Sequence, residues 1–87
     1  MKMIILIVKD HLTDALTAAL TAAQYRVTGI ASTGGFLHSG VTTLLVGADD
    51  TQVEPAIALI RSTVPAASPG QPQATLFVVP VSRYEQV

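Results

Sequence analysis

Residues 25–47 read YRVTGIASTGGFLHSGVTTLLVG, two extended segments separated by a glycine-rich connection. On the first side small and apolar residues alternate with Thr28 and Ile30, and residues 41–46 are all β-branched or leucine. Both patterns favour strands. A two-residue turn is enough to join antiparallel neighbours, whereas residues 33–40 contain three glycines. The connection is therefore longer than a tight hairpin requires.

The residue types around this connection indicate a ligand cradle. Glycines let backbone N–H groups approach a ligand closely, while Phe36 offers a flat face for a base and Arg26 a cation for phosphate. Gly34 and Gly35 are typical of an anion-binding nest. The turn nevertheless lacks the Lys-Ser/Thr pair of a P-loop, and no helix is expected after it.

The rest of the chain supplies two helices and two further strands. Residues 3–8 are a continuous apolar run, typical of a central strand, and Asp10 is placed to cap the helix that follows. The first helix carries an apolar stripe at helical spacing, which consists of Leu12, Ala15, Leu16, Ala19, Leu20 and Ala23.

The second helix begins where Thr51 and Glu54 stand in capping-box spacing, with Pro55 tolerated in its first turn. Its predicted buried stripe is Val53, Ile57, Ile60 and Val64. Residues 74–81 are predicted as the last strand, ended by Pro80 at a sheet edge or strand end. Residues 64–73 before it hold three prolines and a glycine but no charge, so we expect an exposed loop.

The predicted order of elements is therefore β-α-β-β-α-β. Two βαβ halves of this order favour a four-stranded antiparallel sheet with both helices on one face, the ferredoxin-like α+β arrangement. The length of 87 residues favours one domain, residues 1–87.

Composition points to an assembly of several subunits. A chain this short buries only about 60–65% of its unfolded surface, yet 49% of its residues are apolar and 13% are charged. Some apolar surface is therefore expected to be covered by other subunits. Five Lys and Arg residues and a net charge of -1 argue against a nucleic-acid partner, which requires a basic stripe.

Catalytic and metal sites are not expected. The chain has no cysteine, and its two histidines, His11 and His38, stand in no metal-ligand spacing with another donor. Asp49 and Asp50 are more typical of a helix cap than of catalytic carboxylates, because no nucleophile accompanies them. We therefore expect neither catalytic residues nor a cofactor, and the aromatic Tyr25, Phe77 and Tyr84 are interpreted as core or interface fillers.

No membrane insertion is expected either. The apolar run at residues 3–8 is six residues long, whereas a signal peptide needs about 7–15 and a membrane span about 20. The cytosol is therefore the expected location.

A resemblance to a known family sharpens these expectations. Residues 26–47, RVTGIASTGGFLHSGVTTLLVG, resemble the core motif of the PII-like cyclic-di-AMP receptors, and so do the opening MKMIILIVKD and residues 74–86, ATLFVVPVSRYEQ. The resemblance spans nearly the whole chain. It implies the ferredoxin-like fold, a homotrimer, and cyclic-di-AMP or a related adenine nucleotide in clefts between subunits. It also implies a protein partner, which it does not identify.

The ligand-binding residues that the resemblance implies are Arg26, Thr28, Gly35, Phe36, Leu37 and Gly47. Arg26 is expected to bind phosphate, and Thr28 shares its face of the strand because it is two residues on. The alternatives are that Arg26 forms a salt bridge, that Phe36 fills a subunit interface, and that Gly47 is only a strand exit. His38 is expected to contact phosphate in place of a basic residue of the family.

Two positions and one loop depart from the family pattern. Gln24 and Val41 stand where family members commonly carry a ligand-binding Asn, and Val41 has no hydrogen-bonding side chain. A lost buried polar contact costs about 1–3 kcal/mol. Residues 64–73 are all that remains of a long loop. Two functional classes therefore stay open: a nucleotide receptor, or a diverged trimeric PII-like interaction module that has lost nucleotide binding.

Overall fold

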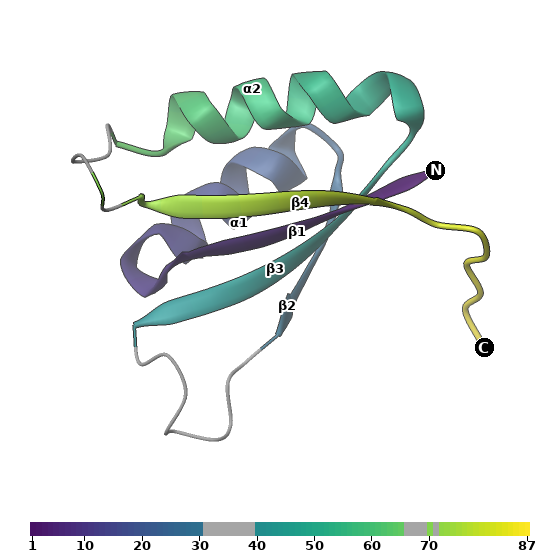
Figure 1. Ribbon diagram of the computed structural model, residues 1–87, viewed down its shortest axis with the longest axis horizontal. Helices are drawn as coiled ribbons and strands as arrows, with labels where there is room; N and C mark the ends of the chain where they lie inside the picture. Colours follow the sequence, from purple (N-terminus) through teal and green to yellow (C-terminus); the bar gives the residue numbers. More distant parts are fainter. Residues whose placement is uncertain (31–39, 66–69, 71) are drawn as a thin grey trace.

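The fold was analysed in a computed structural model, which describes residues 1–30, 40–65, 70 and 72–87. Four strands form one antiparallel sheet in the order β2-β3-β1-β4, and two helices pack on one of its faces (Figure 1). The bounds of the strands are β1 Lys2–Lys9, β2 Arg26–Ile30, β3 Val41–Ala48 and β4 Ala74–Pro80. The helices are α1 Thr13–Ala22 and α2 Val53–Thr63. The predicted βαββαβ fold is therefore confirmed.

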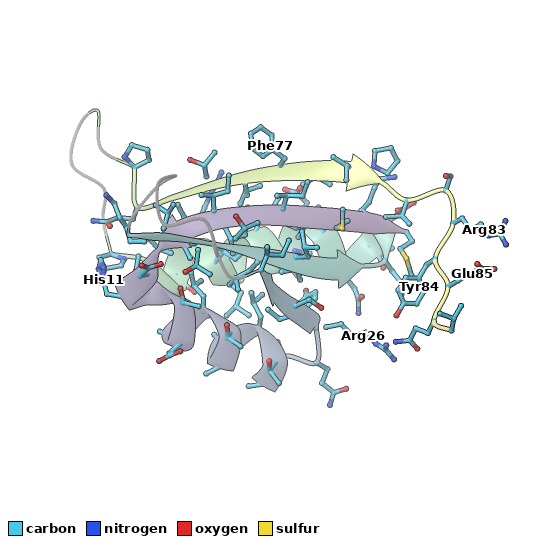
Figure 2. All side chains as sticks on the ribbon, turned by 90° about the horizontal axis from the view of Figure 1, so that it is seen from below. His11, Arg26, Phe77, Arg83, Tyr84 and Glu85 are labelled. Carbon is cyan, nitrogen blue, oxygen red and sulfur yellow. The ribbon has the colours of Figure 1, made fainter. Side chains whose placement is uncertain are left out.

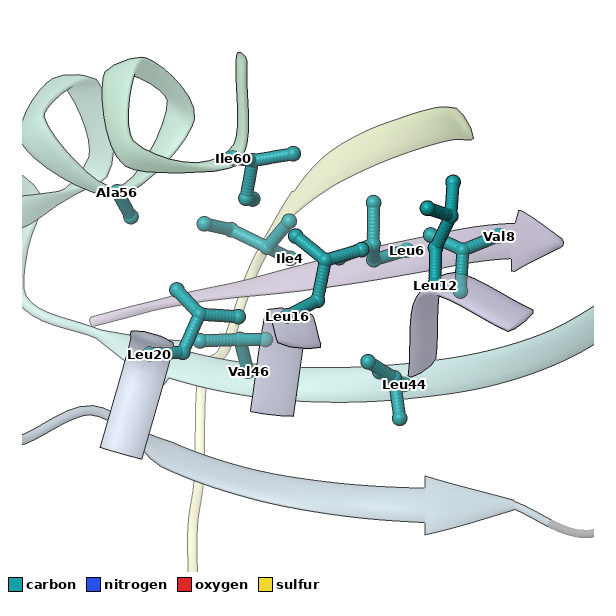
Figure 3. Packing of buried hydrophobic residues seen from close by; sticks show 10 residues of the cluster. All are labelled: Ile4, Leu6, Val8, Leu12, Leu16, Leu20, Leu44, Val46, Ala56 and Ile60. Atoms are coloured by element: carbon teal, nitrogen blue, oxygen red, sulfur yellow. The ribbon is translucent and has the colours of Figure 1, made fainter. Parts of the chain in front are cut away.

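The core lies between the helices and one face of the sheet (Figure 3). Side chains alternate along a strand, and in β1 every second residue is almost fully buried. Burying each large apolar side chain contributes about 1.5–3 kcal/mol. The ten buried residues of this cluster are Ile4, Leu6, Val8, Leu12, Leu16, Leu20, Leu44, Val46, Ala56 and Ile60.

The first helix begins differently from the prediction. A 3-10 turn, η1 Asp10–Leu12, precedes α1, and no side chain caps either segment. The prediction that Asp10 is the cap was therefore wrong. Its carboxylate instead accepts a hydrogen bond from the Thr42 hydroxyl, and its backbone N–H donates to the Gly40 carbonyl at 2.8 Å. These bonds join the helix entry to β3. Of the predicted stripe, the three leucines are buried, whereas Ala15 and Ala23 are exposed.

The second helix also has a 3-10 entry, η2 Asp50–Gln52. The capping box is formed by Asp49 and Gln52, and the Asp49 N–H donates to the Gln52 side-chain oxygen at 3.3 Å. The predicted box of Thr51 and Glu54 was wrong because the 3-10 turn places the helix entry two residues earlier. Pro55 lies in the first turn of α2, as predicted.

The buried face of α2 differs from the predicted stripe in one respect. Ala56 is fully buried between Val53 and Ile60, while Ile57 is only half-buried. Val64 follows the helix as its C-terminal cap and packs against the core. The edge position of β4 and its end at Pro80 are confirmed. Residues 66–69 and 71 of the predicted loop lie outside the described residues.

One end of the sheet carries a surface ion pair. The Lys2 ammonium nitrogen and the Met1 amino nitrogen each lie 3.4 Å from a carboxylate oxygen of Asp50, at the entry to α2. Lys2, and with it the amino group of Met1, lowers the pKa of the Asp50 carboxyl below its usual value of 3.8. Because the carboxyl is exposed, solvent and salt screen this interaction strongly.

We expect Asp50→Asn to lower the free energy of unfolding near neutral pH in low salt. A carboxyl whose pKa is lowered in the folded state stabilises the fold above the unfolded-state pKa, near 3.8, and loses this effect as the pH falls through the lower folded-state value. Urea unfolding of both proteins at neutral and strongly acid pH measures the effect. Asp14→Asn, also in a first helical turn, controls for the helix dipole. A difference that persists in acid contradicts the assignment.

Candidate functional site

The candidate site lies on the face of the sheet that the helices leave open. In the register of β2 and β3, Arg26 is directly opposite Gly47 and Thr28 is opposite Leu45. Val27 packs against the core from the other side of the strand. Because side chains alternate along a strand, Arg26, Thr28 and Gly47 all lie on the open face. The structure thus brings together three of the residues predicted to bind ligand.

Gly47 leaves room beside Arg26. Directly opposite residues of an antiparallel pair have Cβ atoms about 4.5–5.5 Å apart, but a Cβ built on Gly47 would have no atom within 4 Å. The glycine is exposed and lies one residue before the end of β3 at Ala48. It is therefore a point at which a ligand can approach the backbone beside the Arg26 side chain.

The Arg26 guanidinium has no carboxylate partner in the part of the chain that the structure describes. Ion pairs there join Asp50 to Lys2 and to the Met1 amino group, and Arg83 to Glu85. The interpretation of Arg26 as a salt-bridge partner thus finds no support within this chain. Its charge is available for an anion, which a guanidinium binds through two parallel N–H donors.

Tyr84 contacts Arg26, and sequence reasoning missed this pair. The Arg26 Nη1 atom donates to the Tyr84 hydroxyl oxygen at 3.4 Å, across a separation of 58 residues (Figure 2). No periodicity relates positions this far apart; the only sequence signal was the resemblance of residues 74–86. Tyr84 is 56% exposed. It is therefore not a core residue of this chain.

The other two aromatic residues have separate surroundings. The Tyr25 ring packs against the core, and its hydroxyl donates to the Gln52 carbonyl at 3.0 Å. Tyr25 is thus the core filler that was expected. Phe77 is 54% exposed and projects from β4 on the side away from the helices (Figure 2). Within this chain it is not a core residue.

Gln24 has a structural role that sequence reasoning did not anticipate. It is the residue after the C-terminal cap of α1 and has a φ of 70°. Its N–H donates to the Thr21 carbonyl at 2.9 Å, and the Tyr25 N–H donates to the Leu20 carbonyl at 2.9 Å. This is the Schellman motif, in which the left-handed position favours Gly or Asn. A preference for Asn here thus has a backbone explanation as well as a ligand-binding one.

Val41 lies far from Arg26 within one chain. It opens β3 opposite Lys9, whereas Gly47 lies six residues further along the same strand, which corresponds to about 20 Å. This distance is longer than one base. A nucleotide base that lies beside Arg26 and Gly47 therefore cannot also contact Val41 of the same chain. Gly35, Phe36, Leu37 and His38, the remaining predicted site residues, lie outside the described residues.

The open face is apolar away from this polar end. Because core-facing residues alternate with them, the residues of the central strands that point to the open face between Gly47 and the far end at Lys9 are Met3, Ile5, Ile7, Val41, Thr43 and Leu45. On the edge strands Phe77 pairs with Ile5, and Ile30, 48% exposed, pairs with Thr43. No described element of the chain covers this face. It is therefore a large apolar surface suited to a subunit interface.

A concavity lies on the helix side of the molecule. It is a shallow hollow of about 400 Å³ between the end of α2 and β4, lined by Ile60, Arg61, Val64, Pro65, Gln73, Ala74 and Leu76. Arg26 is not part of it.

Other kinds of site were sought in the described ranges. No group of three or more His, Asp or Glu side chains there is placed to hold a metal ion. His11 is exposed in η1, at the end of the sheet opposite to Arg26 (Figure 2). Among the helices described, none is long and apolar enough to span a membrane.

Two comparisons relate the chain to known proteins. A family model described as "Cyclic-di-AMP receptor" matches residues 1–68. The chain is also similar to a crystal structure of a functionally unknown protein from Pediococcus pentosaceus ATCC 25745, with 28% identity and a TM-score of 0.77. That alignment covers 99% of this chain and 96% of the other, so the two proteins have nearly the same length.

We expect Gln24→Gly to raise the free energy of unfolding by about 0.5–1 kcal/mol, because glycine adopts a positive φ without a Cβ clash. Urea unfolding of both proteins measures the change. Ala18→Gly, on the exposed face of α1, is the matched control and should lower stability by about 1 kcal/mol. Equal losses in both variants would show that Gln24 is not held in the left-handed conformation.

Proposed function

Because the chain belongs to the cyclic-di-AMP receptor family, we propose that it binds cyclic-di-AMP or a related adenine nucleotide at the Arg26 end of its open sheet face. The observation that supports this most directly is the position of Arg26 opposite Gly47. An exposed guanidinium without a carboxylate partner among the described residues stands beside a point where the backbone is uncovered.

Each residue of this end has a chemical role in the proposal. Arg26 binds one phosphate of the nucleotide through charge-assisted hydrogen bonds. The Thr28 hydroxyl, on the same face, donates to a phosphate oxygen or to a ring nitrogen of the base. Gly47 lets a base or the sugar–phosphate ring approach β3 closely. These groups form part of a pocket for a molecule with two phosphates and two bases, so further groups must come from elsewhere.

We propose that a second subunit supplies them, in a homotrimer of single-domain chains. The apolar open face supports an assembly because water-exposed patches of this kind are rare on monomers. A trimer, rather than a dimer, is what the family resemblance implies. Gly35, Phe36 and Leu37 remain proposed ligand residues that complete the site. In this proposal the protein acts as a receptor that passes the nucleotide signal to a protein partner, and not as an enzyme.

A second candidate function rests on Val41. Its side chain has no hydrogen-bonding group where the resemblance implies an amide, which favours a trimeric interaction module without a nucleotide. Calorimetric titration of cyclic-di-AMP separates the two. Saturable binding supports the receptor, whereas a trimer that binds neither cyclic-di-AMP nor other adenine nucleotides supports the module.

We expect Arg26→Ala to weaken cyclic-di-AMP binding at least tenfold, because a charge-assisted hydrogen bond to phosphate contributes about 1.5–3 kcal/mol. Calorimetry on wild type and variant measures the dissociation constants, and circular dichroism verifies that the fold persists. Arg61→Ala is the matched control, since Arg61 is exposed on α2, across the sheet from the site. Equal affinities for wild type and Arg26→Ala would exclude Arg26 as a ligand residue.

We expect Phe77→Glu to dissociate the trimer, because it places a charge on the apolar open face. Sedimentation equilibrium at micromolar concentration measures the mass of the particle. Ala58→Glu, on the exposed side of α2, introduces the same charge away from the open face and should leave the mass unchanged. A folded wild-type monomer at these concentrations would contradict the proposed assembly.

A further inference from the structure

We infer that Tyr84 is a positioning residue for Arg26, brought to it by the C-terminal segment, residues 81–87. The inference rests on the proposed function for the identity of the ligand. It rests on the structure for the contact itself, the 3.4 Å hydrogen bond from Arg26 Nη1 to the Tyr84 hydroxyl oxygen. Tyr84 also lies beyond the residues that the family model matches.

The sheet topology explains how the segment reaches Arg26. Pro80 at the end of β4 pairs with Lys2, Lys2 pairs with Ala48, and Gly47 pairs with Arg26, so four strand termini meet at one end of the sheet. From β4 to β2 there are three strand spacings, about 14 Å. Residues 81–84 in extended form span about 13 Å. The backbone thus crosses nearly the whole distance, and the long Tyr84 and Arg26 side chains span the rest (Figures 1 and 2).

Local contacts orient the segment during this crossing. The Val81 N–H donates to the Met1 carbonyl at 3.1 Å, which starts the crossing beside β1. Arg83 and Glu85 pair with each other at 2.6 Å. Because neighbours in an extended chain point to opposite sides, this pair leaves Tyr84 on the other side, toward Arg26. The Arg83 charge is also occupied by Glu85, so it does not compete with Arg26 for an anion.

A phenol hydroxyl is a suitable partner for a phosphate-binding arginine. Guanidinium has five N–H donors and no acceptor. The Tyr84 oxygen accepts from one of them and carries no charge, so the positive charge and the other donors remain available to phosphate. A carboxylate in the same place would neutralise the charge. The hydrogen bond from Arg26 to Tyr84 restricts the long, exposed Arg26 side chain before the ligand binds. Less conformational entropy is then lost on binding.

The test is Tyr84→Phe, which removes only the hydroxyl group. We expect cyclic-di-AMP to bind about 2- to 10-fold more weakly, the cost of ordering one long side chain. In the Arg26→Ala background the same change should have no further effect, because the hydroxyl acts through Arg26. Tyr25→Phe is the matched control, since it removes a hydroxyl that donates to the Gln52 carbonyl and does not contact Arg26. It should leave the affinity unchanged.

A measurement on the protein without nucleotide tests the contact between Tyr84 and Arg26 independently of the proposed function. In ligand-free protein the NMR signal of the Arg26 side-chain Nε–H group should shift in Tyr84→Phe and stay in place in Tyr25→Phe. If wild type binds neither cyclic-di-AMP nor another adenine nucleotide, the proposed function fails, and this signal alone decides the contact. An unchanged signal overturns the inference. So does a Tyr84→Phe affinity loss that is equally large with and without Arg26, since it would show a role independent of that residue.

Discussion

The structure depends on the one-sided packing of both helices against β1. Every second residue of this central strand, Ile4, Leu6 and Val8, is buried beneath the helices. Since side chains alternate along a strand, the same pattern sends the remaining apolar residues of β1 to the opposite face. That face has no cover from this chain in the described ranges. One-sided packing therefore produces both a stable core and an apolar surface suited to other subunits.

The candidate site follows from this asymmetry. Strand β2 begins beside the end of β3 at the polar end of the open face, which places Arg26 opposite Gly47. The guanidinium contacts only a neutral hydroxyl among the described residues, so its charge is retained for an anion. In the proposed assembly, a neighbouring subunit on the apolar face would lower the exposure of Arg26 to water, and the attraction between its guanidinium and a phosphate would become stronger as water is excluded.

Of the ligand residues that the resemblance implies, Arg26, Thr28 and Gly47 share the open face of one chain, whereas Gln24 and Val41 have other surroundings. Gln24 closes a Schellman motif, and its left-handed position favours Gly or Asn, so a preference for Asn there has a backbone explanation. Val41 lies at the far end of β3 from Gly47. One ligand molecule therefore cannot contact, within a single chain, all the residues that the resemblance implies. This is consistent with a site shared between subunits.

Local patterns in the sequence determined the elements, their order and the fold class, because burial alternates with period 2 in strands and close to 3.6 in helices. They also determined that Arg26 and Thr28 share a face, and that β4 ends at Pro80 on a sheet edge. The helix entries were predicted wrongly at Asp10 and at Thr51. There a 3-10 turn precedes each helix, and the bonds that hold it come from β3 or from a different capping pair. Only the tertiary structure decided that Arg26 lies opposite Gly47, contacts Tyr84 and is remote from Val41. These relations depend on strand register and on the path of the C-terminal segment, and contacts between residues 58 positions apart leave no periodic signal in a sequence.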